Sequence, residues 1–190
     1  MDNLKKRILE DARVMDKDIL KVDSFLNHQI DVKLLVEMGL ELHRRFAGEP
    51  VTKILTIESS GISVACATAM NFHVPVIFAK KGSSRKSDDE VFSVNAYSYT
   101  KQEPYVMNVS RKYIGNKDHI LIIDDFLANG EAALAMLEIV RMAGATLAGI
   151  GIVIEKAFQK GGKAIRDKGI RLETLVSIQS MENGRIIFRD

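Results

Sequence analysis

The sequence has little of several features that would place a chain in a special class. It holds one cysteine, Cys66, among 190 residues, so an internal disulfide framework and a cysteine-rich zinc site are excluded, and a reducing compartment suits it best. Only 3 prolines occur, and no repeat, low-complexity tract or linker divides the chain. A chain of this length buries roughly 70% of the surface that its unfolded form exposes, so one α/β domain is stable without a disulfide or a structural metal ion.

Long apolar runs and a charge surplus are also lacking. No apolar run approaches the ~20 residues needed to span a bilayer, and the charged residues 1–7 are not followed by the apolar core of a secretory signal. Lys and Arg number 27 against 25 Asp and Glu, a net charge of +2 that argues against a generic nucleic-acid binder but allows a local basic patch. We therefore expect a cytoplasmic, folded protein with neither a membrane nor a nucleic acid as partner.

What the chain does contain is an alternation of helix and strand patterns. Apolar spacing predicts a short amphipathic helix in residues 2–15 and a second helix that begins at the N-cap Asp31 and ends at Gly48. Further on it predicts strands at 54–57, 74–79, 120–123 and 147–154, helices at 62–72 and 131–142, and extended arms at 94–100 and 105–109. This order is typical of an α/β fold with a doubly wound, mainly parallel sheet flanked by helices, which binds ligands outside the carboxyl ends of its strands.

The most informative segment follows the apolar run 120–123. Asp124 and Asp125 close that strand, and adjacent carboxylates repel each other unless a cation or a hydroxyl-rich group neutralises them. A loop of small residues then opens a helix, and the backbone N–H groups of such a loop form a cradle for a phosphate. The two features together suggest a phosphorylated sugar as ligand.

Other interpretations of this segment are weaker. Asn129-Gly130 is a hairpin signal, but Leu134, Leu137 and Val140 keep helical spacing after it. A phosphoacceptor receiver domain would need ~120 residues after the acidic pair, far more than remain. A surface strand end that binds no ligand stays open.

Residues 120–132 resemble the phosphoribosyl pyrophosphate (PRPP) motif of the type I phosphoribosyltransferases, with an apolar strand, two acids, a small-residue loop with glycine, and a helix. Residues 20–29, 56–62, 97–102 and 149–156 resemble the members of that family that act on xanthine, so the similarity covers essentially the whole chain. The resemblance implies the type I phosphoribosyltransferase fold and a homodimer. It also implies a single domain, 1–190, in which residues 1–30 and about 156–190 build a hood over the base.

The resemblance also implies roles for individual residues. Asp124 and Asp125 would hold the ribose hydroxyls, and the 5′-phosphate would bind to the loop residues Ala128, Asn129, Gly130, Glu131 and Ala132. The purine would contact Leu20, Asn27 and Lys156. Because an ammonium only donates hydrogen bonds, Lys156 would accept a 6-oxopurine and disfavour adenine by roughly 1–3 kcal/mol. A surface lysine at 156 and an ordinary turn or cap asparagine at 27 are the alternatives.

A second cradle, Glu58-Ser59-Ser60-Gly61, follows the strand 54–57. By the resemblance, Ser59, Ser60 and Gly61 belong to the loop that holds pyrophosphate and that often contains a non-proline cis peptide. Many relatives carry a basic side chain there, whereas this chain has serines, so the positive charge must come from elsewhere. The candidates lie in a stretch without apolar residues, 80–90, which we expect to be a loop that closes over pyrophosphate: Lys80, Arg85, Lys86 and, as first choice, Lys81. A solvated loop is the alternative, because three acids follow at 88–90.

The implied reaction is transfer of the phosphoribosyl group from PRPP to xanthine, which yields xanthosine 5′-monophosphate and pyrophosphate. Mg²⁺ would arrive with PRPP, since no residue cluster has the spacing of a metal site of its own. Ala128 stands where the hypoxanthine-guanine branch has an aspartate, so no general base is identifiable.

Two alternatives to this function remain: another 6-oxopurine as the base, or a PRPP-binding regulator. The regulator is disfavoured because the ~50 residues before the first sheet strand are too few for an added DNA-binding domain.

Overall fold

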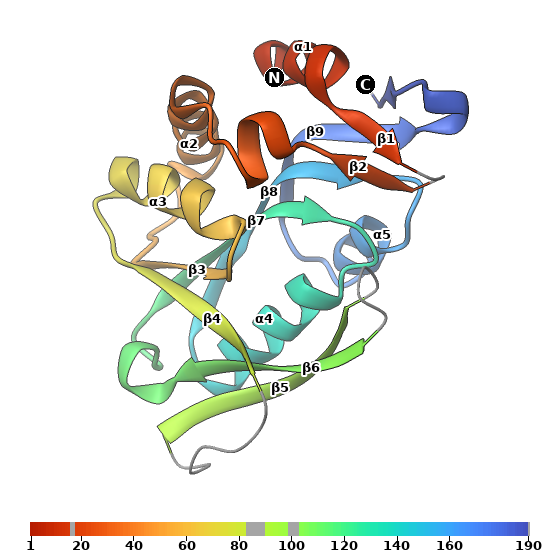
Figure 1. The fold of residues 1–190 in the computed structure, drawn as a ribbon. Coiled ribbons are helices and arrows are strands. Elements are labelled where there is room, and N and C mark those ends of the chain that lie inside the picture. Colours follow the sequence, from red (N-terminus) through yellow and green to blue (C-terminus); the bar gives the residue numbers. More distant parts are fainter. Residues whose placement is uncertain (16–17, 83–89, 99–102, 190) are drawn as a thin grey trace.

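The computed structural model describes residues 1–15, 18–82, 90–98 and 103–189, and within them the chain forms an eight-stranded sheet (Figure 1). The strand order is β10-β9-β8-β7-β3-β4-β6-β5. The central strands run parallel: β9 (Leu172–Ser180), β8 (Thr146–Lys156), β7 (His119–Leu127), β3 (Lys53–Ile57) and β4 (Val76–Gly82). Antiparallel strands lie at the two edges: β10 (Ile187–Phe188) at one, β6 (Glu103–Ser110) and β5 (Val91–Ser98) at the other. The mainly parallel sheet is confirmed.

Helices cover both faces of this sheet. On one side pack α2 (Val32–Phe46) and α3 (Gly61–Phe72), and on the other α4 (Glu131–Met142), with the β5–β6 arm curled around it (Figure 1). Alternate residues of β7 serve the two layers, since Leu121 and Ile123 belong to the α2–α3 core and Ile120 and Ile122 to the α4 core. Burial on both faces explains why the strand is a continuous apolar run.

The N-terminal segment differs from the prediction of one helix in residues 2–15. Helix α1 (Asp2–Asp11) ends early, because Ala12 is extended, and Arg13–Met15 form β1, which pairs antiparallel with β2 (Ile19–Lys21). The apolar spacing changes at that point from helical to alternating, with Val14 half-buried between exposed neighbours. A π-helical turn, η1 (Asp23–Asn27), leads on to α2.

Of the two capping residues predicted for α2, the one at the start is confirmed and the one at the end is wrong. The N-cap Asp31 is confirmed, because its carboxylate accepts a hydrogen bond of 3.1 Å from the Leu34 amide. The expected glycine cap at Gly48 is wrong: the helix ends at Phe46, Ala47 keeps right-handed helical angles, and Gly48 does not adopt the left-handed conformation. A turn in which the Glu49 amide donates to the Phe46 carbonyl ends the helix instead.

Several strands extend further than predicted, because neighbouring strands pair with their ends. β7 continues through the acidic pair to Leu127, with Asp124 opposite Ile152 of β8. β4 begins at Val76 and includes Lys80 and Lys81, since Lys81 pairs with Met107 of β6. The expected loop from Lys80 is therefore wrong for residues 80–82, and residues 83–89 and 99–102 lie outside the described residues.

The remaining elements connect or extend the sheet. They are η3 (Arg111–Tyr113), α5 (Gly161–Arg166) and η4 (Glu182–Gly184). The two chain ends lie on the same side of the molecule, beside the β1–β2 hairpin (Figure 1), and the Met1 ammonium donates to the Leu175 carbonyl of β9 at 3.2 Å. Among the described residues, no helix has the length and apolar character to cross a membrane.

Candidate active site

The acidic pair lies at the carboxyl end of β7 and is buried. Asp124 is 5% and Asp125 is 7% exposed, and the Asp125 amide donates to the Asp124 carboxylate at 3.0 Å. Burial and the neighbouring charge of Asp125 raise the pKa of Asp124 well above its ordinary value, while the positive charge of Lys81 opposes this rise. Two adjacent buried carboxyl groups favour a ligand that brings hydroxyl groups or a cation.

Directly after the acids, residues 128–130 form a tight loop that leads into α4. Gly130 is the N-cap of α4 with a φ of +90°, a left-handed conformation that favours glycine. No side chain within the described residues caps this helix, so the first-turn N–H groups, including those of Glu131 and Ala132, are left for a ligand. Amides at a helix N-terminus bind a phosphate by charge and by geometry.

The second cradle, residues 58–60, is a turn between β3 and α3. The peptide bond between Glu58 and Ser59 is cis, as the resemblance implies. A Cβ atom on Gly61 would overlap the Thr56 hydroxyl and approach the Asp124 carboxylate to 2.8 Å, so only glycine lets α3 begin this close to the acid. The predicted pyrophosphate loop and the acidic pair are thereby adjacent.

Lys81 and Tyr105 enter the same region from β4 and β6. The Lys81 amide donates to the Glu58 carboxylate at 2.6 Å, and the Lys81 ammonium lies 5.7 Å from the centre of the Tyr105 ring. Partial burial raises the pKa of Tyr105, and the charges of Asp124 and Glu131 raise it further. Sequence reasoning missed Tyr105, whose only signal was an aromatic residue on alternating positions of an extended arm. Arg85 and Lys86 lie outside the described residues.

Lys156 ends β8 and points toward the N-terminal segment. Its ammonium donates to the Asp18 carbonyl at 2.5 Å and lies 5.6 Å from the centre of the Phe126 ring. Burial lowers the pKa of Lys156, and the charge of Asp18 opposes this shift. Lys156 is therefore not a free surface lysine, and Phe126, which follows the acidic pair, is a second residue that sequence reasoning missed.

The other two predicted base contacts lie near this point of the chain but differ in exposure. Leu20 is 6% exposed in β2, where it pairs with Val14, whereas Asn27 is exposed at the end of η1. The structure thus brings the N-terminal hairpin, the end of β8 and the end of β7 to one side of the molecule (Figure 1).

A cavity of about 720 Å³ lies beside the first half of β4, where this strand does not pair with β6. Pro75, Phe78 and Tyr113 contribute apolar surface to it, and Lys80 and Lys81 line its edge. Neither aspartate lines it, so this cavity is distinct from the acidic edge of the sheet.

Comparison with protein families matches residues 21–181 to the phosphoribosyl transferase domain. The chain belongs to this family. It is 54% identical to xanthine phosphoribosyltransferase of Clostridium novyi (strain NT) and 56% identical to that of Ruminiclostridium cellulolyticum, in both cases over 100% of both chains. Identity to the xanthine phosphoribosyltransferase of Bacillus cereus (strain G9842) is 52%, over 99% of this chain and 95% of the relative.

Solved phosphoribosyltransferases have the same fold. Adenine phosphoribosyltransferase from Thermoanaerobacter pseudethanolicus matches with a TM-score of 0.76 at 19% identity, over 93% of this chain and 98% of that one. The enzyme from Giardia lamblia, complexed with 9-deazaadenine, matches with a TM-score of 0.76 at 18% identity, over 92% and 97% of the two chains. At this identity the likeness shows the fold alone, and it confirms the type I phosphoribosyltransferase architecture.

Three neighbouring strands of this phosphoribosyltransferase domain bring the candidate residues together at their carboxyl ends. The acidic pair lies near the end of β7 and the first cradle follows it, the second cradle follows β3, and Lys81 lies near the end of β4. Among the described residues, no group of three or more His, Cys, Asp and Glu side chains could hold a metal ion. The buried pair Asp124–Asp125 suits a substrate that carries its own cation, because Mg²⁺ is commonly bound through one or two carboxylates together with substrate phosphates. The roles of the individual residues stay predictions.

Proposed function

We propose that this chain transfers the 5-phosphoribosyl group from PRPP to xanthine, giving xanthosine 5′-monophosphate and pyrophosphate in purine salvage. The observation that carries the proposal is full-length identity of 54% and 56% to relatives named xanthine phosphoribosyltransferase. The geometry supports it independently, because a buried pair of aspartates, which could bind a diol, lies between two cradles suited to phosphates.

In this proposal the chain holds PRPP at both ends. Amides of residues 128–132 bind the 5′-phosphate, and Asp124 and Asp125 accept hydrogen bonds from the ribose hydroxyls. Ser59, Ser60 and Gly61, with the charge of Lys81, hold the pyrophosphate. Mg²⁺ bound with PRPP supplies neutralisation of the leaving pyrophosphate.

Bond formation then needs little chemistry from the protein. A purine nitrogen attacks the anomeric carbon while the bond to pyrophosphate breaks, and the positive charge that develops on the ribose is stabilised by the buried carboxylates beside it. Ala128 offers no carboxylate to receive the purine proton, so xanthine, which is an acidic purine, releases this proton to water and reacts as the anion.

Recognition of the base rests on Lys156, Asn27 and Leu20. Lys156 donates to a carbonyl of xanthine, in place of the Asp18 carbonyl to which it donates in the structure. Phe126, under the ammonium, offers an aromatic face on the same side. Adenine would present an amino group to a side chain that only donates, so it is disfavoured.

We also propose that the chain works as a homodimer in the cytoplasm. Phe78 and Tyr113, which line the cavity beside β4, are 42% and 55% exposed, and a second copy of the chain would cover such apolar surface. Sedimentation equilibrium checks this: we expect twice the 21.2 kDa chain mass, and a single-chain mass at micromolar concentrations would count against a dimer.

The reaction is tested by parallel assays of PRPP-dependent nucleotide formation with xanthine, guanine, hypoxanthine and adenine. We expect the highest kcat/KM for xanthine and the lowest for adenine. Turnover of adenine without xanthine would overturn the base assignment. Tight PRPP binding in calorimetry with no nucleotide from any purine would favour a regulator instead.

A further inference from the structure

The phosphate loop is in direct backbone contact with the first residue of α5. The Gly161 amide donates a hydrogen bond of 3.0 Å to the Ala128 carbonyl. A Cβ atom on Gly161 would overlap that carbonyl oxygen and lie 2.6 Å from the Gly130 nitrogen and 2.8 Å from the Asn129 carbonyl carbon. All three are backbone atoms of the loop, so a side chain at 161 could fit only if the loop moved.

This contact also determines where the loop amides point. The Ala128 carbonyl and the Asn129 N–H belong to one trans peptide unit, in which the two groups point in opposite directions. Because the carbonyl points to Gly161, the Asn129 N–H points away from α5. The hydrogen bond from Gly161 therefore fixes the direction of an amide in the predicted phosphate cradle.

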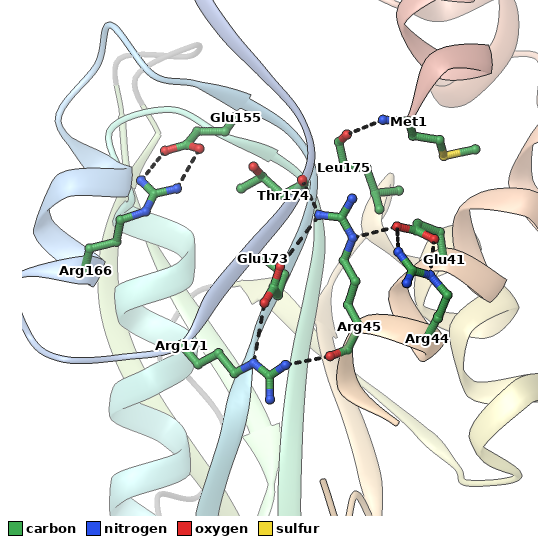
Figure 2. A network of polar contacts seen from close by, with 10 residues as sticks. All are labelled: Met1, Glu41, Arg44, Arg45, Glu155, Arg166, Arg171, Glu173, Thr174 and Leu175. Carbon is green, nitrogen blue, oxygen red and sulfur yellow. Dashed lines mark hydrogen bonds and ion pairs between the residues drawn. The ribbon is translucent and has the colours of Figure 1, made fainter. Parts of the chain in front are cut away.

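An ion pair between a half-exposed arginine and a buried glutamate holds α5 in this place. Arg166 donates to the two Glu155 carboxylate oxygens at 2.6 and 2.8 Å (Figure 2), and Glu155 is 1% exposed at the end of β8. Ser177 of β9 adds a hydrogen bond of 3.2 Å to the same carboxylate. A Cβ atom on Gly162 would overlap a Glu155 oxygen, so the second glycine lets the ion pair close over α5.

We propose that Gly161 is a positioning residue, whose backbone holds the phosphate loop in the conformation that binds the 5′-phosphate of PRPP. This inference rests on the proposed function, because it assigns the ligand of the loop as a 5′-phosphate. Gly161 touches neither substrate nor reacting atoms, and it acts only through the Ala128–Gly130 backbone.

The test uses Gly161→Ala and two matched glycine variants. Gly39→Ala would place a Cβ atom 2.5 Å from the Ala67 backbone between α2 and α3, and it serves as the purely structural comparison. Gly48→Ala places its Cβ in open space and serves as the neutral one. For each variant we would measure the melting temperature, kcat and both KM values, and the Kd of PRPP and of pyrophosphate by calorimetry.

For Gly161→Ala we expect the Kd and KM for PRPP to rise about tenfold or more, with the Kd of pyrophosphate and the KM for xanthine within about twofold of the wild type. Pyrophosphate is the informative ligand, because it binds at the loop 59–61 and lacks the 5′-phosphate. For Gly39→Ala we expect a lower melting temperature and an unchanged Kd for PRPP. Gly48→Ala should match the wild type in all measurements.

The inference is overturned if folded Gly161→Ala binds PRPP as the wild type does, or if it weakens PRPP and pyrophosphate equally. Should Gly161→Ala not fold, Arg166→Lys decides: it keeps the charge but loses the two-pronged contact with Glu155, and we expect a Kd for PRPP about threefold higher with pyrophosphate unchanged. An unchanged PRPP affinity in Arg166→Lys would then overturn it. A wild-type chain that does not bind PRPP would instead overturn the proposed function.

Discussion

Asp124 is an acid that the fold buries at a cost. Its carboxyl lies close to the start of α3 and beside a second aspartate, with Lys81 as the opposing charge. The raised pKa means that the ionised form is less stable in the folded than in the unfolded chain. At neutral pH this lowers the stability of the fold, and the cost vanishes below the ordinary value of 3.8, where both states are protonated.

We therefore predict opposite effects of Asp124→Asn on stability and activity. At pH 8 the variant should be more stable than the wild type by about 1 kcal/mol, and this gain should disappear as the pH falls toward 3.8. Its kcat/KM should fall at least about 100-fold, because a charge that stabilises the developing cation is lost. Thermal unfolding at several pH values, together with the nucleotide assay, measures both.

Asp118→Asn is the control with the opposite sign. Burial alone would raise the pKa of Asp118, but hydrogen bonds from Lys53 and Gly115 lower it, so this carboxylate stabilises the fold above its ordinary pKa. Asp118→Asn should lower the melting temperature at pH 8 and leave kcat/KM near that of the wild type. If Asp124→Asn also lowers stability at pH 8, the cost that we assign to the buried acid is absent.

A second residue-scale prediction concerns Lys156. Lys156→Ala should lower the preference for xanthine over adenine, measured as the ratio of kcat/KM values, by about tenfold, because one mispaired polar contact contributes roughly 1–3 kcal/mol. The Kd for PRPP should stay within about twofold. Lys33→Ala, at an exposed position in the first turn of α2, should change neither quantity. An equal loss of purine preference and PRPP affinity would indicate that Lys156 is structural.

At the scale of elements, α2 is tied to β9 of the sheet by a polar network (Figure 2). Glu41 accepts hydrogen bonds from Arg44 and Arg45, and Arg45 continues to the Thr174 carbonyl of β9 at 2.8 Å. The hydrogen bond from Arg44 outweighs the burial of the carboxyl and, with Arg45, lowers the pKa of Glu41 from 4.5 to about 2. A lowered carboxyl pKa stabilises the fold above 4.5, and this contribution is lost as the pH falls to about 2.

We predict that Glu41→Gln lowers the free energy of unfolding at pH 7 by about 1 kcal/mol. The difference from the wild type should shrink between pH 4.5 and 2, where the wild-type carboxyl becomes protonated. Glu138→Gln removes a similar pair, with Arg141 on the exposed side of α4, and should have a smaller effect, since this pair lies within one helix and both side chains are well exposed. Urea unfolding over this pH range tests the prediction, and an effect that does not depend on pH would contradict it.

Helices and strands were predictable from the sequence where local residues determine the structure. The ends of strands were not predictable where pairing with a neighbouring strand determines them. The burial of both faces of β7 is visible in the run 120–123, and Asp31 marks the start of α2. The continuation of β4 through Lys81 depends on pairing with β6, and no local pattern carries that information. The acidic pair and both cradles were predictable because each is a local pattern of neighbouring residues. Tyr105 was not, because the β5–β6 arm brings it within range of the charge of Asp124 and close to Lys81.

At the scale of the whole molecule, the N-terminal helix is part of the core and not an appendage to it. Leu4 and Ile8 of α1 are fully buried in the same cluster as Phe25 and Met38. The Met1 ammonium also contacts β9, near the other end of the chain. If 1–190 is a single domain, as the sequence predicts, a segment that is fixed in this way unfolds together with the sheet.

This can be tested with two leucines of one helix. Leu4→Ala removes a fully buried side chain and should lower the free energy of unfolding by about 2–5 kcal/mol, with one cooperative transition retained. Leu9→Ala, on the same helix at 60% exposure, should change it by less than about 0.5 kcal/mol. Urea unfolding followed by circular dichroism and by tyrosine fluorescence distinguishes the outcomes, because coincident curves mean one unit. Two separate transitions in Leu4→Ala would show that the N-terminal part folds independently of the sheet, and the single-domain prediction would then be wrong.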